Sequence, residues 1–261
     1  MDKQIRLDKY ISESTGDSRS KSRQWIKKKR VKVNGLPATD PGYKITPQKD
    51  EVSLDGNLLE YDRHHYLMLH KPAGVISARS SDQERTVLDL VLGQDYQGNV
   101  FSPAVYHDVF PVGRLDKDTE GLLLMTDDGD LAHALLSPRK HVEKSYFVVL
   151  DGPVGEREAG MFHEGLDIGD EKRTMPAGIR PATEEEMGRH LPDNLNGYGV
   201  FVTLKEGRYH QVKRMARAVG REVVYLKRIS MGSLVLDPAL KPGQCRSLTH
   251  EEVEHLKENN S

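Results

Sequence analysis

The charges of this chain are segregated along the sequence, and this feature constrains the fold more than any other. The first 49 residues contain thirteen Lys or Arg and five Asp or Glu, which gives a net charge of +8. Because the whole 261-residue chain has a formal net charge of −2, residues 50–261 must sum to −10. A basic segment attached to an acidic body indicates a polyanion-binding module beside a second domain. A solvated charged surface is the alternative that composition alone leaves open.

The basic segment has the pattern of a small α/β module. Residues 5–13 predict a short amphipathic helix, and Ser18 is a suitable cap for a second helix over residues 19–30. Residues 31–35 (VKVNG) predict a strand that ends in an Asn-Gly turn, and residues 51–56 predict another strand. The apolar side chains expected in the core of this module are Leu7, Tyr10, Ile11, Trp25 and Ile26.

These patterns predict two domains. Residues 1–60 form the first domain, residues 61–65 (YDRHH) a polar linker, and residues 66–261 the second domain. Strands and helices alternate in the second domain without an internal repeat, which favours a mixed α+β body. The expected elements are a strand, turn and helix over 121–138, a strand over 144–152, a polar loop with room for a short helix over 181–199, and a strand, turn and helix over 200–220.

Several classes of protein are disfavoured by what the sequence lacks. No run approaches the roughly 20 apolar residues that span a bilayer, and the N-terminus lacks the apolar region of a signal peptide. The single cysteine, Cys245, cannot form an internal disulfide or a cysteine-rich zinc site. Glycine-rich nucleotide loops and the GxSxG pattern are absent as well. We therefore expect a cytoplasmic protein that needs neither a metal nor a cofactor.

Residues 113–130 (GRLDKDTEGLLLMTDDGD) place acidic residues beside an apolar strand. Asp116, Asp118 and Glu120 fall on ligand positions of a calcium loop, but the ninth and twelfth positions are Leu and Asp, so a calcium site is disfavoured. Capping of turns by these acids is a second reading. Arg114 lies two residues before Asp116, and a cation near a carboxylate at the rim of a core keeps that carboxylate ionised. The pattern therefore favours a functional acid.

A second candidate segment is EGRYHQVKRM, residues 206–215, around a predicted strand-to-helix turn. Cations at a helix N-terminus are electrostatically unfavourable unless they face a carboxylate or a phosphate backbone. An exposed basic helix start is the alternative, and His210 alone could be structural. Tyr146, in the predicted strand KSYFVVL, is a third candidate, although most strand tyrosines only pack. The polar side chains of the second segment that could act on a substrate are Arg208, His210, Gln211, Lys213 and Arg214.

Together these segments resemble a known family, the pseudouridine synthases. GRLDKDTEGLLLMTDDG, EKSYFVVL and EGRYHQVKRM are similar to its three core motifs in the branch named after RsuA, and HKPAGVISA at residues 70–78 resembles the first core strand of that branch. The segment from RLDKYISE to KKKRVKVNG is similar to the RNA-binding S4 domain. The resemblance extends from Arg6 to about Glu252, nearly the whole chain.

The resemblance implies an α+β fold, in which a small α/β RNA-binding module precedes a catalytic domain with a long, mostly antiparallel mixed sheet. It also implies a reaction without a cofactor, the isomerisation of uridine to pseudouridine. Asp116 would be the catalytic nucleophile or base, Tyr146 would stack on the target base, and Lys213 would pair with Asp116, with Arg214 as second choice. The expected substrate contacts are Arg114, Val212, Arg214, Arg208, His210 and Gln211.

The partner that the resemblance implies is ribosomal RNA, in a partly assembled small subunit and with the enzyme as a monomer. Small-subunit 16S RNA, with an activity of the uridine-516 type, is the expected target. A large-subunit 23S RNA synthase of the same branch and a non-catalytic assembly factor are the alternatives. The basic module would supply the RNA contacts Arg6, Lys9, Arg19, Lys21, Arg23, Lys27, Lys28 and Arg30.

Overall fold

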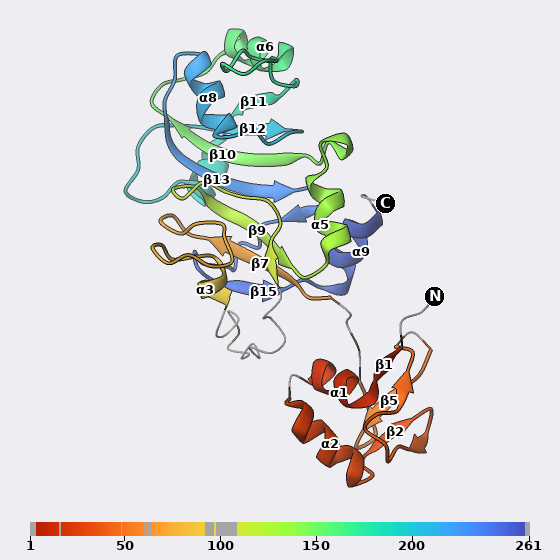
Figure 1. The fold of residues 1–261 in the computed structure, drawn as a ribbon. Helices are drawn as coiled ribbons and strands as arrows, with labels where there is room; N and C mark the ends of the chain where they lie inside the picture. Colours follow the sequence, from red (N-terminus) through yellow and green to blue (C-terminus); the bar gives the residue numbers. More distant parts are fainter. Residues whose placement is uncertain are drawn as a thin grey trace. The chain divides into compact units, whose positions relative to one another are not determined.

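The computed structural model describes residues 4–15, 17–47, 49–59, 61, 64–91, 97 and 109–258. The described residues divide between His65 and Tyr66 into two compact units, which are described separately (Figure 1). Within the expected linker, residues 62 and 63 lie outside the described residues. No helix of the described part is long and apolar enough to cross a membrane.

In the N-terminal unit, two helices and a small antiparallel sheet share one core. The apolar sides of α1 (Leu7–Thr15) and α2 (Arg19–Lys27) pack against a four-stranded sheet of order β3-β2-β5-β6, and β1 pairs with β4. Four of the expected core residues, Leu7, Tyr10, Ile11 and Ile26, are buried, whereas Trp25 is half-buried. The strands are β1 (Ile5–Arg6), β2 (Val31–Val33), β3 (Leu36–Pro37), β4 (Lys44–Ile45), β5 (Val52–Leu54) and β6 (Asn57–Leu58).

Local sequence signals account for most boundaries of this unit. The Ser18 side chain accepts a hydrogen bond from the Lys21 amide and caps α2, as predicted. Asn34 and Gly35 both have positive φ, 51° and 80°, which a tight hairpin turn requires. The second helix ends at Lys27, three residues earlier than predicted, because Lys29 adopts a left-handed conformation with φ 55°.

A buried carboxylate organises part of the basic surface. The Asp8 side chain is 0% exposed and accepts hydrogen bonds from the half-exposed guanidinium groups of Arg6, Arg19 and Arg23 at 2.8–3.1 Å. Burial opposes ionisation of Asp8, but these three arginines outweigh it and lower the pKa of the carboxyl far below its ordinary 3.8. Three of the eight expected RNA contacts therefore form one cluster around Asp8.

The remaining expected RNA contacts have different surroundings. Ion pairs join Lys9 to Glu13 at 3.5 Å and Lys21 to Asp17 at 2.7 Å, and Arg30 pairs with Asp55. Exposed pairs of this kind contribute little, so their cations can still meet phosphate. Lys27 and Lys28 are exposed and form no ion pair with the described residues.

Replacing Asp8 with Asn is expected to lower the free energy of unfolding of the N-terminal unit by about 2 kcal/mol, because three charge-assisted hydrogen bonds lose their charged acceptor. Since the pKa of Asp8 is lowered in the folded state, this stability is present above pH 3.8 and is lost as the pH falls toward the lowered pKa. Urea unfolding, followed by the fluorescence of the single tryptophan, Trp25, measures it at pH 7 and pH 3.

The matched control is Asp17→Asn, which removes an exposed pair with Lys21 and should shift stability by less than about 0.5 kcal/mol. Equal unfolding midpoints for wild type and Asp8→Asn at pH 7 would contradict the structural role of Asp8.

The second unit is built on one long, strongly twisted sheet of strand order β11-β12-β10-β13-β9-β7-β15 (Figure 1). Every pairing along this path is antiparallel except that of β13 with β9, so the predicted long, mostly antiparallel sheet is confirmed. The seven strands in this order are β7 (Tyr66–Lys71), β9 (Glu120–Thr126), β10 (Lys144–Leu150), β11 (Gly178–Pro181), β12 (Tyr198–Leu204), β13 (Val223–Met231) and β15 (Cys245–Ser247).

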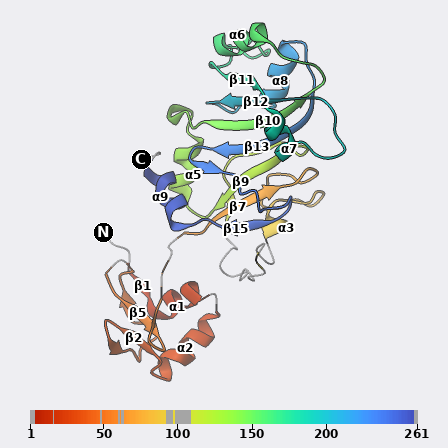
Figure 2. The same cartoon turned by 180° about the vertical axis from the view of Figure 1, so that it is seen from behind.

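Helices pack against the sheet in several places, two of which form apolar clusters with its strands. Leu131 and Leu135 of α5 share a core with strand residues of β7 and β9 and with Leu256 of α9. On one face of β10, Phe147 packs with Phe201 and with Met187 of α7. Helix α7 is labelled in Figure 2, which shows the molecule from the side opposite to Figure 1. The other elements are α3 (Leu88–Val91), β8 (Phe110–Pro111), α5 (Gly129–Leu136), η1 (Pro138–Lys140), α6 (Glu156–Glu164), α7 (Glu184–His190), α8 (Gln211–Ala218), β14 (Leu234–Val235) and α9 (His250–Glu258).

The face of the sheet opposite α7 carries the candidate site. Side chains alternate along a strand, so Tyr146 of β10 points away from the Phe147 cluster and lines a cavity instead. Arg228 of β13 is the register partner of Tyr146 and lines the same cavity. β13, the central strand of the sheet, was not predicted from the sequence.

Candidate active site

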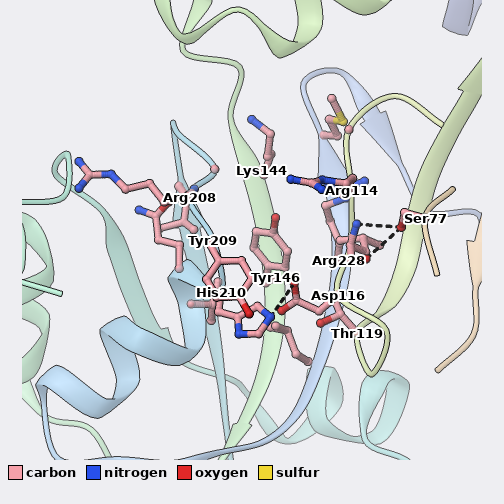
Figure 3. Close-up of a pocket in the computed structure, with 18 of the residues that line it drawn as sticks. Ser77, Arg114, Asp116, Thr119, Lys144, Tyr146, Arg208, Tyr209, His210 and Arg228 are labelled. Carbon is pink, nitrogen blue, oxygen red and sulfur yellow. Dashed lines mark hydrogen bonds and ion pairs between the residues drawn. The ribbon is translucent and has the colours of Figure 1, made fainter. Parts of the chain in front are cut away.

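A cavity of about 570 Å³ lies over β10 and β13, and it collects residues from every candidate segment (Figure 3). One wall is the loop between β8 and β9, which includes Asp116, and another is the turn before α8, residues 207–210. Tyr146 and Arg228 come from the two strands, and residues 76–78 are also part of the lining. The cavity has room for one nucleotide base and its sugar, within the range of small-molecule sites.

The loop that carries Asp116 is fixed by hydrogen bonds from the segment 70–78. The Ser77 hydroxyl donates to the Leu115 carbonyl at 2.9 Å and accepts from the Leu115 amide at 3.0 Å. Gly121 begins the buried part of β9 with φ 106°, and a Cβ there would lie 2.2 Å from the carbonyl oxygen of Arg228. The glycine of the GRLD…TEG pattern therefore permits the close approach of β9 to β13.

Lys71, at the end of β7, is a buried cation under the same loop. Its ammonium group donates to the carbonyl oxygens of Lys117 at 3.3 Å, Thr119 at 2.8 Å and Pro72 at 3.0 Å. Burial lowers the pKa of Lys71 to about 8, and the carboxylates of Asp118, Glu120 and Asp116 limit that shift. Sequence reasoning missed this residue, although the HKPAG segment contains it.

Replacing Lys71 with Met is expected to lower the turnover number by about a hundredfold. The loop loses its two hydrogen bonds from the Lys71 ammonium group, and a displacement of about 1 Å in a catalytic group has an effect of that size. Single-turnover isomerisation and a thermal melt of the same preparations separate this from unfolding. Lys241→Met is the control, since Lys241 is exposed and does not line the cavity. A Lys71→Met enzyme that is folded and fully active would contradict the anchoring role.

Asp116 lies between two cationic or ionisable groups from α8 and the turn before it. Asp116 Oδ2 is 3.5 Å from Lys213 Nζ, and Asp116 Oδ1 is 3.5 Å from His210 Nε2. The carboxylate is 27% exposed, so a substrate in the cavity can reach it. Of the two candidates for the cation that pairs with Asp116, Lys213 and not Arg214 lies next to it.

Lys213 also binds a second carboxylate. Its Nζ lies 2.6 Å from Asp118 Oδ1, and Asp118 is 72% exposed. Partial burial opposes ionisation of Asp118, but the hydrogen bond from Lys213 outweighs it and lowers the pKa of Asp118. Glu120 accepts a hydrogen bond from the Tyr225 hydroxyl at 2.8 Å instead. The three acids of the calcium-like pattern thus have different partners, and the described residues contain no cluster of His, Cys, Asp or Glu suited to a metal ion.

The other polar residues of the second segment hold the turn before α8. The guanidinium groups of Arg208 and Arg214 both contact Asp170, and they also donate to carbonyl oxygens of residues 168–173. Gln211 is buried and donates to Glu206 at 2.7 Å while accepting from the Arg208 amide at 2.8 Å. These contacts position the turn, and direct contacts of the three residues with a substrate stay a prediction.

Side chains from the strands, from α8 and from the loop before β9 give the cavity an aromatic wall and a charged floor. Tyr146 and Val212 are nearly buried and line it, as does the exposed Arg114, which has no ion pair with the described residues. Arg228 is 3% exposed, donates through Nε to the Leu122 carbonyl at 2.8 Å, and leaves Nη2 without a partner among the described residues. Sequence reasoning missed Arg228, whose signal is a lone arginine in the apolar stretch VVYLKRISM.

The cavity therefore brings together an accessible carboxylate, a lysine next to it, a histidine and an aromatic wall. An ionised carboxylate can act as a nucleophile or a base without activation by a second group. A flat aromatic wall suits a flat substrate such as a nucleobase that has left its stack.

Comparison with known proteins agrees with these features. Residues 65–218 match the family model for RNA pseudouridylate synthase, and residues 5–52 match the S4 domain. The chain is 42% identical over 254 residues to an uncharacterized RNA pseudouridine synthase of Bacillus subtilis, covering 97% of this chain and 99% of the relative. It is 38% identical over 251 residues to ribosomal small subunit pseudouridine synthase A of Escherichia coli, covering 95% and 98%.

A solved structure agrees with this family. A crystal structure of a pseudouridylate synthase matches with a TM-score of 0.61 at 37% identity, covering 97% of this chain and 99% of that chain. The resemblance inferred from the motifs and the predicted α+β fold are therefore confirmed. This chain belongs to the RNA pseudouridylate synthase family of enzymes and carries an N-terminal S4 domain.

Proposed function

We propose that this enzyme isomerises one uridine of 16S ribosomal RNA to pseudouridine, with an activity of the uridine-516 type. The observation that carries the chemistry is the accessible carboxylate of Asp116, 3.5 Å from Lys213 in a cavity walled by Tyr146. The small-subunit target is supported by the Escherichia coli relative, whose name states that subunit and which aligns over 95% of this chain.

The reaction requires one carboxylate and no external reactant. The bond between ribose C1′ and uracil N1 breaks, the base turns, and C1′ joins C5. The C5 proton leaves and N1 gains a proton, so substrate and product are isomers. Asp116 either attacks C1′ or removes a ribose proton, and both routes use its ionised form. Lys213 places a positive charge 3.5 Å from this carboxylate.

The cavity walls would bind the uridine after it leaves the RNA stack. Unstacking costs a few kcal/mol, and stacking of the uracil on Tyr146 offsets part of this. Val212 adds an apolar contact, and Arg114 is placed to meet a phosphate or the sugar edge. His210 would contact the substrate next to Asp116, from which its ring nitrogen is 3.5 Å away.

The N-terminal unit would supply affinity for the ribosomal RNA. Its helix α2 carries Arg19, Lys21, Arg23 and Lys27, and Arg6 and Lys9 lie nearby in the sequence. Contacts of such side chains with phosphates are independent of base sequence and depend strongly on salt. We further propose that the enzyme acts in the cytoplasm, as a monomer, on a partly assembled small subunit.

Mapping of the modified position tests this proposal. Unmodified 16S and 23S transcripts, and small-subunit particles assembled from the 16S transcript, are incubated with the enzyme. Pseudouridines are then marked with a carbodiimide and located as stops of reverse transcription. One new stop in 16S RNA, at the uridine-516 position, is the expected result. A stop in 23S RNA alone would assign the enzyme to the large subunit instead.

A further inference from the structure

Tyr209 is an exposed aromatic residue at the cavity, and the proposed chemistry gives it no role. The residue is 75% exposed although it is one of those that line the cavity. The ring stacks on that of His210, with centroids 3.8 Å apart and an angle of 18° between the planes. Because His210 in turn faces Asp116 at 3.5 Å, the two rings form a short stack that extends outward from the catalytic carboxylate (Figure 3).

The backbone fixes this stack in place. His210 has a left-handed conformation with φ 48°, which is unfavourable for a residue with a side chain and persists only where the surroundings impose it. The amide of Arg214 donates to the His210 carbonyl at 3.0 Å, and Arg214 Nη1 donates to the Tyr209 carbonyl at 3.2 Å. The first turn of α8 therefore holds both residues, and Tyr209 is not simply a side chain on a loose loop.

An aromatic ring held open to solvent is suited to a partner with a flat apolar face. One face of the Tyr209 ring is covered by His210, and the high exposure leaves the other face accessible. When a uridine leaves its stack to enter the cavity, the base of the adjacent nucleotide loses a stacking neighbour. This base remains joined to the target by one phosphodiester link, so it must lie at the mouth of the cavity, where Tyr209 is.

We propose that Tyr209 is a stacking platform for the base of a nucleotide directly adjacent to the target uridine, an inference that rests on the proposed function. The Tyr209 ring replaces the neighbour that the adjacent base loses. Stacking on an aromatic ring accepts any of the four bases, so the platform stabilises the opened RNA without reading its sequence.

Steady-state kinetics on the mapped ribosomal RNA provide the first test. Tyr209→Ala is expected to raise KM by roughly tenfold or more, the effect of losing one base–aromatic stack, while kcat changes less than about threefold. Tyr209→Phe and Tyr209→Trp should retain the wild-type KM, and Tyr209→Leu, which keeps apolar bulk without a ring, should behave like Tyr209→Ala. Tyr198→Ala is the matched control, because Tyr198 is an exposed tyrosine on β12 that does not line the cavity.

Fluorescence of 2-aminopurine provides the second test. The probe replaces the nucleotide on the 5′ or the 3′ side of the mapped uridine in an RNA fragment, and the Asp116→Asn variant binds the fragment without converting it. With Tyr209 present, the probe at one of these positions should remain quenched on binding. In the Asp116→Asn, Tyr209→Ala double variant it should become bright. Equal fluorescence in both proteins at both positions, or an unchanged KM for Tyr209→Ala, overturns the proposal.

These outcomes are separate from a failure of the proposed function. If the wild-type enzyme forms no pseudouridine in ribosomal RNA, the proposed function fails before Tyr209 is tested. If the wild-type enzyme is active and Tyr209→Leu retains the wild-type KM, the proposed function stands and the stacking role is wrong.

Discussion

Asp116→Asn is expected to lower the rate of uridine isomerisation by a factor of about 10⁴ or more, because the amide can neither attack C1′ nor take up a proton. The substitution changes almost no volume, and Lys213 keeps its 2.6 Å contact with Asp118. We therefore expect the variant to fold normally and to bind RNA with nearly the wild-type affinity. Single-turnover isomerisation and filter binding on the same preparation measure the two quantities.

Asp118→Asn is the matched control for this experiment. It removes a carboxylate two residues away that also binds Lys213, but Asp118 is 72% exposed and does not line the cavity. Its expected effect on the rate is below about tenfold, the scale of a weak exposed ion pair. Equal losses in the two variants would show that the shared Lys213, and not the chemistry of Asp116, limits the reaction.

Removal of residues 1–60 is expected to weaken the binding of ribosomal RNA by tenfold or more, with a much smaller change in the rate of the chemical step. The first 49 residues supply a net charge of +8, whereas the cavity residues belong entirely to the second unit. The two units have separate apolar cores, so the second unit should fold without the first. Affinity measured as a function of salt should also show a smaller slope for the truncated protein.

A charge reversal makes the same test in the full-length chain. The double variant Lys27→Glu, Lys28→Glu alters two exposed lysines that form no ion pair with the described residues. It should weaken RNA binding while the urea midpoint reported by Trp25 remains close to the wild-type value. If both this variant and the truncated protein modified the same uridine with unchanged efficiency, the N-terminal unit would have no role in RNA binding.

Features encoded by neighbouring residues could be predicted from the sequence. The cap at Ser18, the turn at Asn34 and Gly35, and the end of α8 near Gly220 each depend on one or two adjacent side chains. The loop with Asp116 and the turn with His210 were predicted as candidate segments because their polar residues contrast with apolar strands on either side. Their approach to each other follows from the motif resemblance and not from periodicity.

Features that depend on distant parts of the chain were missed. Lys71 is buried because the loop residues Lys117 and Thr119, 46 and 48 positions away, offer carbonyl acceptors. Arg228 lies in β13, a strand whose lysine and arginine interrupt its apolar pattern, and the Leu122 carbonyl of the neighbouring strand binds it. Likewise, Asp170 binds Arg208 and Arg214 from a separate loop, so their role in the turn has no local signal.

The most direct test of the central claim is the release of tritium from carbon-5-labelled uridine in ribosomal RNA. Wild type, Asp116→Asn and Asp118→Asn are compared on 16S RNA, on 23S RNA and on assembling small-subunit particles. We predict release from 16S RNA or its particle by wild type and Asp118→Asn, and none by Asp116→Asn. Release by Asp116→Asn at the wild-type rate would contradict the role of this carboxylate, and no release from any substrate by wild type would contradict the proposed reaction on ribosomal RNA.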